Sequence, residues 1–298
     1  MKYPTFQVDA FTNRPLGGNP CAVIFDADSL ETAQMQAIAR EMNLSETSFV
    51  IEPDPATSDV RARYFTPYSE IPMAGHPTIA TIYALAEAGR IPIEGPSTNI
   101  TLQLEAGLFP IEIAEDSRGR RTIWMTQLPP KFMATLPAKE VMPSFGLDLN
   151  DILAGERGPA PIQVVSTGTP QLMIPVKDIE TLKRIKVDRE RYLDLRTRED
   201  FFSVHLFCLG GITDAGATFA RHFADSFEDP FTGSATGGMG AYLWHHELID
   251  SPNFVAEQGH GMQRPGAANV EVLGPRDAIE GVRVGGEAVT ILRGELEL

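Results

Sequence analysis

The sequence predicts an α+β protein built from two similar halves, each a mainly antiparallel sheet around a central helix, with a cleft between them. Three observations lead to this fold class. Apolar and polar residues alternate in segments such as QVDAFTN, TLQLEAG and FPIEIAE, as in sheets with one solvated face. Two helical segments are rich in small residues. Four features recur in the same order about half a chain apart, which indicates a duplicated unit.

The first recurring feature is a strand, a turn and a second strand over residues 3–25, with glycines and Pro20 marking the turn. Residues 160–176 repeat this plan around Pro170, which follows Pro20 by 150 positions. This distance is half of the 298-residue chain and sets the expected boundary between the halves.

We place the first half at residues 1–127 and the second at 128–285, and expect a last strand over 286–298 to pack back on the first half. Residues 127–160 are rich in proline, glycine and charge and are the expected linker.

The next recurring feature is a helix followed by strands. Residues 29–43 carry apolar side chains at helical spacing, with Ser29, Asp26 or Asp28 as the expected N-terminal cap. In the second half, a shorter helix is expected over residues 178–186. The expected strands that follow are 59–65 in the first half, and 201–208 and 216–223 in the second.

Each half then places a turn before a helix of small residues. Gly75 and Gly233 stand at the expected helix starts, 158 positions apart. Each helix leads into a strand with a Glu-x-Gly triplet, Glu105-Ala-Gly107 and Glu257-Gln-Gly259, 152 positions apart. We expect the two helix starts to face one cleft.

Composition limits the kinds of partner. The net charge of −15 argues against nucleic acid and anionic membranes, because both need a basic surface. The most apolar stretch, residues 77–86, is far shorter than a membrane span. Two cysteines exclude a disulfide scaffold, and with no secretory signal visible they fit a cytoplasmic protein.

The glycine-rich run over residues 233–240 lacks both the P-loop lysine and the G-x-G-x-x-G order of nucleotide-binding loops. Small residues at a helix start allow close packing, and they also leave backbone N–H groups open to an anion. Residues 74–78, AGHPT, have the same character. Two such helix starts would suit a small carboxylate.

Among the histidines and cysteines, only His76 is a candidate site residue, and the others are considered first. His245-His246-Glu247 is poorly spaced for a metal and is interpreted as a solvated face, while His205 and His222 lie in apolar strands and are interpreted as structural. Cys21 and Cys208 also lie in apolar strands and are expected to be buried and unreactive. His260 lies in a glycine-rich turn and is uninformative.

His76 differs, because it lies at a predicted helix N-terminus. The positive end of the helix dipole there disfavours the imidazolium and suits a neutral imidazole.

Two carboxylates are candidate site residues. Glu46 follows the first helix and precedes an apolar strand, which brings it to the sheet edge near the cleft. Asp229 precedes Pro230 just before the second small-residue helix, where it is either a cap or turn residue or part of the site.

The chain resembles the phenazine-biosynthesis isomerase (PhzF-like) family across nearly its whole length. The motifs that carry the resemblance are NLSET (43–47), AGHPT (74–78) and DPFTGSA (229–235), with Gly18-Asn19-Pro20 and Gln258-Gly259 in support. The resemblance implies the diaminopimelate-epimerase fold, with two similar halves and the active site in the cleft between them.

The resemblance also implies roles for residues. It makes Glu46 the proton-transferring group, and places His76, Asp229 and Ser234 in the pocket with the backbone of Gly75 and Gly233. Diaminopimelate epimerase has a catalytic cysteine at each helix start, whereas Ala74-Gly75 and Pro230-Phe231 stand here. Two-cysteine racemisation is therefore not expected.

One segment departs from the family pattern. Residues 262–266 read Met-Gln-Arg-Pro-Gly instead of Met-Gly-Arg-Pro-Ser, so the pocket near Arg264 is expected to differ. Most members of the family have no assigned substrate, so the family name is not evidence for phenazine synthesis here.

Together these observations predict a cofactor-independent isomerase that moves a proton on a small carboxylate-bearing substrate, cyclic or amino acid-like, with Glu46 as base and then acid. No metal and no nucleotide are expected, and a homodimer is the candidate assembly. Two alternatives stay open: an epimerase or racemase using Glu46 with Asp229 or His76, and a non-catalytic member that binds a small molecule or a protein.

Overall fold

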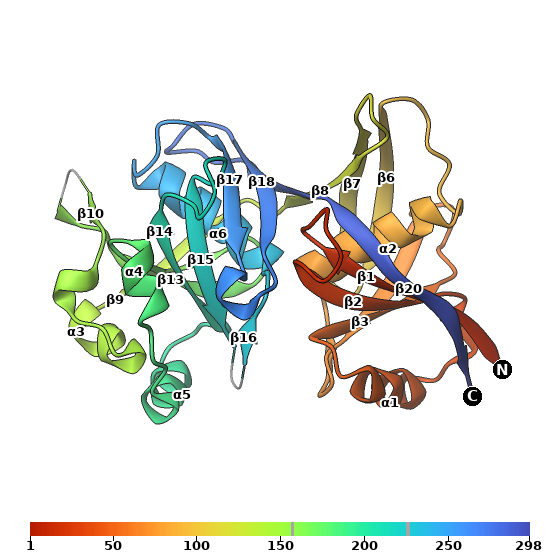
Figure 1. The fold of residues 1–298 in the computed structure, drawn as a ribbon, viewed down its shortest axis with the longest axis horizontal. Helices are drawn as coiled ribbons and strands as arrows, with labels where there is room; N and C mark the ends of the chain where they lie inside the picture. Colours follow the sequence, from red (N-terminus) through yellow and green to blue (C-terminus); the bar gives the residue numbers. More distant parts are fainter. Residues whose placement is uncertain (156–157, 225–226) are drawn as a thin grey trace. The chain divides into compact units, whose positions relative to one another are not determined.

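The computed structural model describes residues 1–155, 158–224 and 227–298. Contacts divide the chain into unit 1, Met1–Thr126 with Gly285–Leu298, and unit 2, Gln127–Val284. Both units combine strands with helices (Figure 1), which confirms the predicted α+β class. No helix in these described ranges has both the length and the apolar character that a membrane crossing requires.

Unit 1 is mostly sheet. Its elements are β1 (Lys2–Ala10), β2 (Asn19–Ile24), η1 (Ala27–Ser29), α1 (Thr32–Met42), β3 (Glu46–Ile51), β4 (Val60–Phe65), β5 (Glu70–Ile71), α2 (Gly75–Glu87), β6 (Ser97–Leu104), β7 (Gly107–Glu115), β8 (Arg121–Gln127) and β20 (Ala288–Glu297).

Unit 2 has more short helices. Its elements are β9 (Lys131–Leu136), α3 (Ala138–Val141), η2 (Met142–Phe145), η3 (Leu149–Asp151), β10 (Ala154–Gly155), β11 (Gly158–Pro159), β12 (Ile162–Ser166), β13 (Pro170–Pro175), α4 (Ile179–Lys183), α5 (Arg189–Arg198), β14 (Ser203–Leu209), β15 (Thr218–Phe223), β16 (Glu228–Asp229), α6 (Gly233–His245), β17 (Asn253–Gln258), η4 (His260–Met262), β18 (Gly266–Leu273) and β19 (Gly281–Gly286).

The strand pairings run in the same order within each unit. In unit 1, β1–β2 is antiparallel, β2–β3 parallel, β3–β4 antiparallel, β4–β6 parallel and β6–β7 antiparallel, with β20 beside β1. In unit 2 the same series is β12–β13, β13–β14, β14–β15, β15–β17 and β17–β18, with β9 beside β12. Antiparallel pairs dominate, as predicted, and the parallel pairs need the helical crossovers between them.

Helix α2 is the buried centre of unit 1. It packs against β1, β2, β3 and β20 (Figure 1), and nearly all of its residues are inaccessible to solvent. Its threonines satisfy polar groups of the sheet: Thr78 Oγ1 lies 3.0 Å from the Tyr64 hydroxyl, and Thr81 Oγ1 donates to Ser48 Oγ over 2.7 Å. These bonds fix how α2 lies on the sheet.

Helix α6 is buried in unit 2 by a different device. It packs against β12, β13 and β18, and glycines bring it close to their side chains. A Cβ atom at Gly238 would lie 2.7 Å from Met173 Cε, and one at Gly240 would lie 2.8 Å from Val270 Cγ1. The glycine-rich run is therefore a close helix-to-sheet contact, as its packing interpretation predicts.

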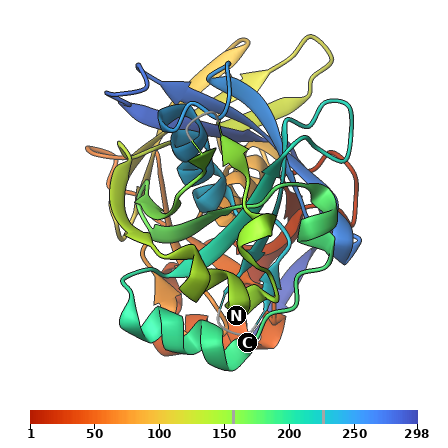
Figure 2. The same cartoon turned by 90° about the vertical axis from the view of Figure 1, so that its left-hand side faces the viewer.

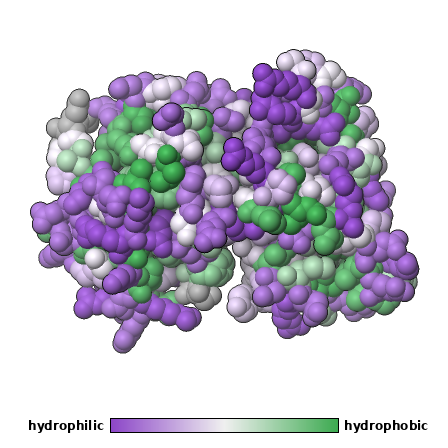
Figure 3. All heavy atoms as spheres, viewed as in Figure 1, coloured by the Kyte–Doolittle hydropathy of each residue, from purple (hydrophilic) through white to green (hydrophobic). Residues whose placement is uncertain are grey.

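The other face of the unit 2 sheet is covered by α3, α4 and α5. Val141, Leu182 and Leu195 from these helices join strand residues in one apolar core. Figure 2 shows α6 behind the strands of unit 2, with α5 nearer the viewer. Hydrophilic side chains cover the outside around α5 (Figure 3), in keeping with its sequence RERYLDLRTR.

Several predictions about single elements were wrong. The first helix begins at Thr32, and its N-cap is Glu31 in a capping box with Gln34, because Ala27–Ser29 form a separate turn of 3-10 helix. The expected linker is structured: β9 pairs with β12, and Phe145 is fully buried in the unit 2 core.

Three further corrections concern a strand end, a helix and a strand pattern. Glu105 lies in the turn between β6 and β7 and not in a strand. The predicted helix over 178–186 is only the short α4, ending at Lys183, and α5 after it was not predicted. The alternation expected in QVDAFTN fails as well, since Val8, Asp9, Ala10 and Phe11 are all buried.

Candidate active site

In unit 1 the structure brings Glu46 and His76 together. Glu46 is the first residue of β3, and its side chain is 17% exposed, so it reaches solvent from a mostly buried position. His76 is the second residue of α2 and is buried. The Oε2 atom of Glu46 lies 3.1 Å from Nε2 of His76. A carboxylate and an imidazole at this distance can share or position a proton.

The imidazole of His76 is neutral. Burial lowers the pKa of His76 to about 3, because the charged ring would lose its hydration. The predicted neutral state agrees with this direction, although burial and not the helix dipole is the cause. On its other side the ring meets Asn19, whose Nδ2 lies 3.0 Å from His76 Nδ1.

A thiol lies behind this pair. Cys21 of β2 is the register partner of Glu46 in β3, and it is fully buried as predicted. Burial and the nearby Glu46 carboxylate both raise the pKa of Cys21, so the group stays a thiol at neutral pH. Cys208 is also buried, and burial raises its pKa to about 12. The prediction of two unreactive cysteines agrees with both environments.

In unit 2 Asp229 organises the turn into α6. It is a mostly buried residue of β16 and accepts a hydrogen bond from the Thr232 hydroxyl. Gln258 closes this turn: its Nε2 donates to the Asp229 carbonyl over 2.7 Å, and its Oε1 accepts from the Thr232 amide over 3.2 Å. The N-cap of α6 is Thr232, so Asp229 is not the cap residue. Its hydrogen bonds are those of a turn residue, the other part of that interpretation.

Amide side chains hold the first turn of α6. Gln127 Nε2 donates to the Gly233 carbonyl over 2.9 Å, and Thr167 Oγ1 donates to Gln127 Oε1 over 2.6 Å. Gln171 Nε2 lies 3.2 Å from the hydroxyl of Ser234, which is half-buried. Gly233 and Ser234 are therefore held in a network of hydrogen bonds between uncharged groups.

The sequence reasoning did not single out Gln127 and Gln171. Both are almost fully buried and lie among apolar strand residues, in WMTQ and PQLMI. A glutamine inside an otherwise apolar strand is the signal that could have found them, because a buried amide needs hydrogen-bond partners.

The remaining histidines belong to unit 2. His205 and His222 form a buried pair in unit 2, with their Nδ1 atoms 3.3 Å apart, in agreement with a structural role. Burial lowers the pKa of both rings, that of His222 to about 3. His245 and Glu247 are exposed, as the solvated-face interpretation predicts, whereas His246 is half-buried and donates to Gln163 Oε1 over 2.8 Å.

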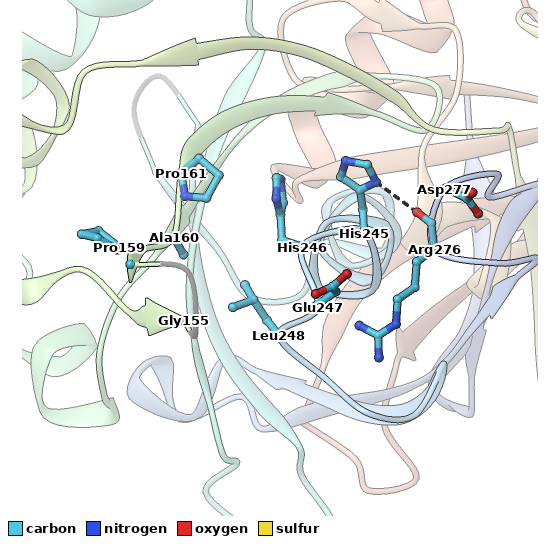
Figure 4. Close-up of a pocket in the computed structure, with 11 residues that line it drawn as sticks. Gly155, Pro159, Ala160, Pro161, His245, His246, Glu247, Leu248, Arg276 and Asp277 are labelled. Atoms are coloured by element: carbon cyan, nitrogen blue, oxygen red, sulfur yellow. Dashed lines mark hydrogen bonds between the residues drawn. The ribbon is translucent and has the colours of Figure 1, made fainter.

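A pocket of about 320 Å³ lies at the C-terminal end of α6 (Figure 4). Its walls include His245, Leu248 and Pro161, and His245 Nδ1 donates to the Arg276 carbonyl over 3.0 Å. None of the predicted site residues lines it. Across residues 1–155, 158–224 and 227–298, no three His, Cys, Asp or Glu side chains are grouped as a metal site would require.

Comparison with known proteins places this geometry in a family. The family model described as "Phenazine biosynthesis-like protein" matches residues 8–294. An "uncharacterized isomerase" of Clostridium acetobutylicum is 32% identical over 100% of this chain and 99% of its own. The trans-2,3-dihydro-3-hydroxyanthranilate isomerase of Pseudomonas fluorescens is 31% identical over 98% of each chain.

Solved structures agree. The phenazine biosynthesis protein of the PhzF family from Bacillus anthracis matches with a TM-score of 0.87 at 32% identity, over 100% of both chains. A hydroxyproline epimerase from Agrobacterium vitis shares the fold with a TM-score of 0.68 at 12% identity, over 99% of this chain and 92% of its own.

The fold, the relatives and the motifs around Glu46 define an enzyme of the isomerase class. The chain belongs to the phenazine biosynthesis-like (PhzC-PhzF) family, as its sequence motifs predict.

Proposed function

We propose that this isomerase transfers a proton between carbon atoms of a small carboxylate-bearing substrate, cyclic or amino acid-like, without a cofactor. The observation that supports this most is the pairing of a partly exposed carboxylate, Glu46, with a buried neutral imidazole 3.1 Å away. Glu46 would take a proton from a substrate carbon, whose electron pair moves into the adjacent π system. The carboxylic acid, which exchanges with solvent, would then protonate another carbon.

The other predicted residues take supporting roles in this proposal. His76 positions Glu46, with Nε2 3.1 Å from Oε2 of the carboxylate. Asp229, held in place by its hydrogen bond with Thr232, orients the substrate. The backbone at Gly75 and Gly233 and the Ser234 hydroxyl bind the carboxylate. The N–H groups of a helix start suit a negative charge, and the hydrogen bonds around Ser234 favour a fixed cradle.

The first probe is trans-2,3-dihydro-3-hydroxyanthranilate, the compound named for the Pseudomonas fluorescens relative. The protein and the probe are mixed in D₂O, and the product is followed by ¹H NMR. We expect isomerisation with deuterium at the newly protonated carbon, and the same rate after dialysis against a chelator. Loss of the reaction with chelator, restored by a metal, would contradict cofactor independence.

The second probe separates the alternatives. Trans-4-hydroxy-L-proline, the ligand named for the Agrobacterium vitis structure, tests epimerase chemistry at the α-carbon. Suppose that deuterium exchanges at that carbon with inversion and that none enters the dihydro-hydroxyanthranilate probe. The protein would then be an epimerase and not the proposed isomerase. Binding of either probe without any exchange would favour a non-catalytic binding protein. Glu94→Gln, at an exposed position of unit 1, is the matched control for changes at Glu46.

A further inference from the structure

The hairpin between β1 and β2 is tightly constrained. Asp9 Oδ2 accepts from the Leu16 amide over 2.7 Å, within the turn. Gly18 has a φ of +52°, and a Cβ there would lie 2.0 Å from the Ala10 carbonyl oxygen, so only glycine fits. Asn19 follows as the first residue of β2, in register with Ala10. The turn thus fixes the backbone position from which the Asn19 side chain extends.

The Asn19 amide settles which nitrogen of His76 carries the proton. Asn19 is fully buried, and its Nδ2 lies 3.0 Å from His76 Nδ1. An amide NH₂ group is only a donor, so Nδ1 must accept with its lone pair. In a neutral imidazole the single proton is then on Nε2, the atom 3.1 Å from Glu46 Oε2.

We propose that Asn19 is a positioning residue that holds His76 as its Nε2–H tautomer, so that the ring presents an N–H and not a lone pair to Glu46, and is not a base. The lone pair of Nδ1 is then used by the Asn19 amide, and Nε2, 3.1 Å from Glu46 Oε2, carries the proton. No lone pair of His76 is left to take a proton from the substrate. The inference rests on the proposed role of Glu46, and it argues against an epimerase that uses His76 as its base.

The arrangement has a consequence for Glu46. A donor facing the carboxylate favours its ionised form and holds one oxygen in place, which leaves the other oxygen for the substrate proton. With Nδ1–H instead, a lone pair on Nε2 would face the carboxylate and repel it. The tautomer therefore decides whether Glu46 is held as a base.

The tautomer can be read directly by ¹⁵N NMR of the full chain with labelled histidine, without substrate. The chain has six histidines, so the His76 signals are assigned by their loss in His76→Gln. We expect a proton on Nε2 and none on Nδ1. A wild-type ring with its proton on Nδ1 overturns the inference, and this reading needs no variant at Asn19 to fold.

Asn19→Asp tests the cause. A carboxylate can only accept, so His76 must then carry a proton on Nδ1, as the other tautomer or as imidazolium. Asn99→Asp makes the same change at an exposed position of β6 and should leave the His76 signals unchanged. An unchanged tautomer in Asn19→Asp would show that another group sets it and would overturn the assignment to Asn19.

Turnover separates this inference from the proposed function. With the dihydro-hydroxyanthranilate probe, we expect Asn19→Asp to lower kcat at least ~10-fold with little change in KM, since the base is misplaced and the binding groups are not. Unchanged kcat with a switched tautomer would refute the positioning role while leaving Glu46 as the base. Full turnover in Glu46→Gln would instead refute the proposed function, whatever the tautomer.

Discussion

The starts of the two central helices are built from different chemistry. In unit 1, α2 begins with Gly75 and His76, and the imidazole lies against the Glu46 carboxylate. In unit 2, α6 begins with Gly233 and Ser234, and amide and hydroxyl side chains surround this turn. The Asp229 carboxylate of unit 2 accepts from Thr232.

The contrast suggests which part of the proposed reaction each unit supports. A carboxylate paired with a buried imidazole can move a proton, whereas a set of neutral donors and acceptors holds a group in place. In the proposed function, proton transfer is therefore the part of unit 1 residues and substrate orientation the part of unit 2 residues.

The helices differ in packing as well. Four residues after its first glycine, α2 carries Ile79, whereas α6 carries Gly237. Isoleucine fills space around α2, while glycine lets the Gln127 side chain lie against α6. The amide network of unit 2 therefore depends on the absence of a side chain at this position.

The largest expected effect is a difference in acid stability. Burial lowers the pKa of His76 in unit 1 and of three histidines in unit 2, His205, His222 and the half-buried His246. Each ring binds a proton in the unfolded chain below pH 6.5 but stays neutral when folded, so stability falls as pH drops through this window. The slope is about 1.4 kcal/mol per pH unit for a fully buried ring and less for His246, so unit 2 should lose stability at least roughly twice as steeply.

Hydrogen exchange measured by mass spectrometry at pH 6.5 and 4.5, corrected for intrinsic rates, resolves the two units. Peptides of the unit 2 strands should lose more protection than those of unit 1. An equal loss of protection in both units would contradict the predicted difference in acid stability.

The second effect concerns the close contact of α6. A Cβ at Gly237 would lie 2.0 Å from Gln127 Oε1, so Gly237→Ala should cost about 1–3 kcal/mol in the free energy of unfolding. The cost should shrink in a Gln127→Ala background, since the obstructing amide is gone. Gly261→Ala is the control, because no atom lies within 4 Å of its Cβ position. Equal costs at both glycines in urea unfolding would argue against the close contact.

The smallest effects are at peripheral helix starts. Asp188 caps α5 of unit 2 by accepting from the Arg191 amide over 3.2 Å, and Asp188→Ala should cost ~1 kcal/mol. Gln34 of α1 in unit 1 supplies half of a capping box, and Gln34→Ala should cost less because Glu31 still serves the other half. Thermal unfolding of both variants measures the two losses of stability. A larger loss in Gln34→Ala than in Asp188→Ala would contradict this prediction.

Much of the fold could be predicted from local sequence. Hairpins at residues 3–25 and 160–176 and the buried helices after Gly75 and Gly233 follow from turn residues and small-residue patterns. Caps were harder, because Ser29, Asp26 and Asp28 all have the right chemistry and only the backbone path selects Glu31. The ordered segment after Gln127 was missed, since its prolines and glycines hide core residues such as Phe145.

The site shows the same limit. Glu46 and His76 are 30 positions apart, and no spacing rule brings a strand start to a helix start, so their predicted roles came from the family motifs. The hydrogen bonds of Gln127 and Gln171 depend on tertiary contacts with α6 that no local pattern encodes.

The most direct test of this account compares Glu46→Gln with Asp229→Asn in one assay. Turnover of the dihydro-hydroxyanthranilate probe is followed in D₂O, and affinity for the probe is measured by calorimetry. Glu46→Gln should bind normally and lose at least ~10²-fold in turnover, because the amide cannot carry the proton, whereas Asp229→Asn should lose less turnover. Near-normal deuterium transfer by Glu46→Gln, or a larger loss in Asp229→Asn, would contradict the assignment of proton transfer to unit 1.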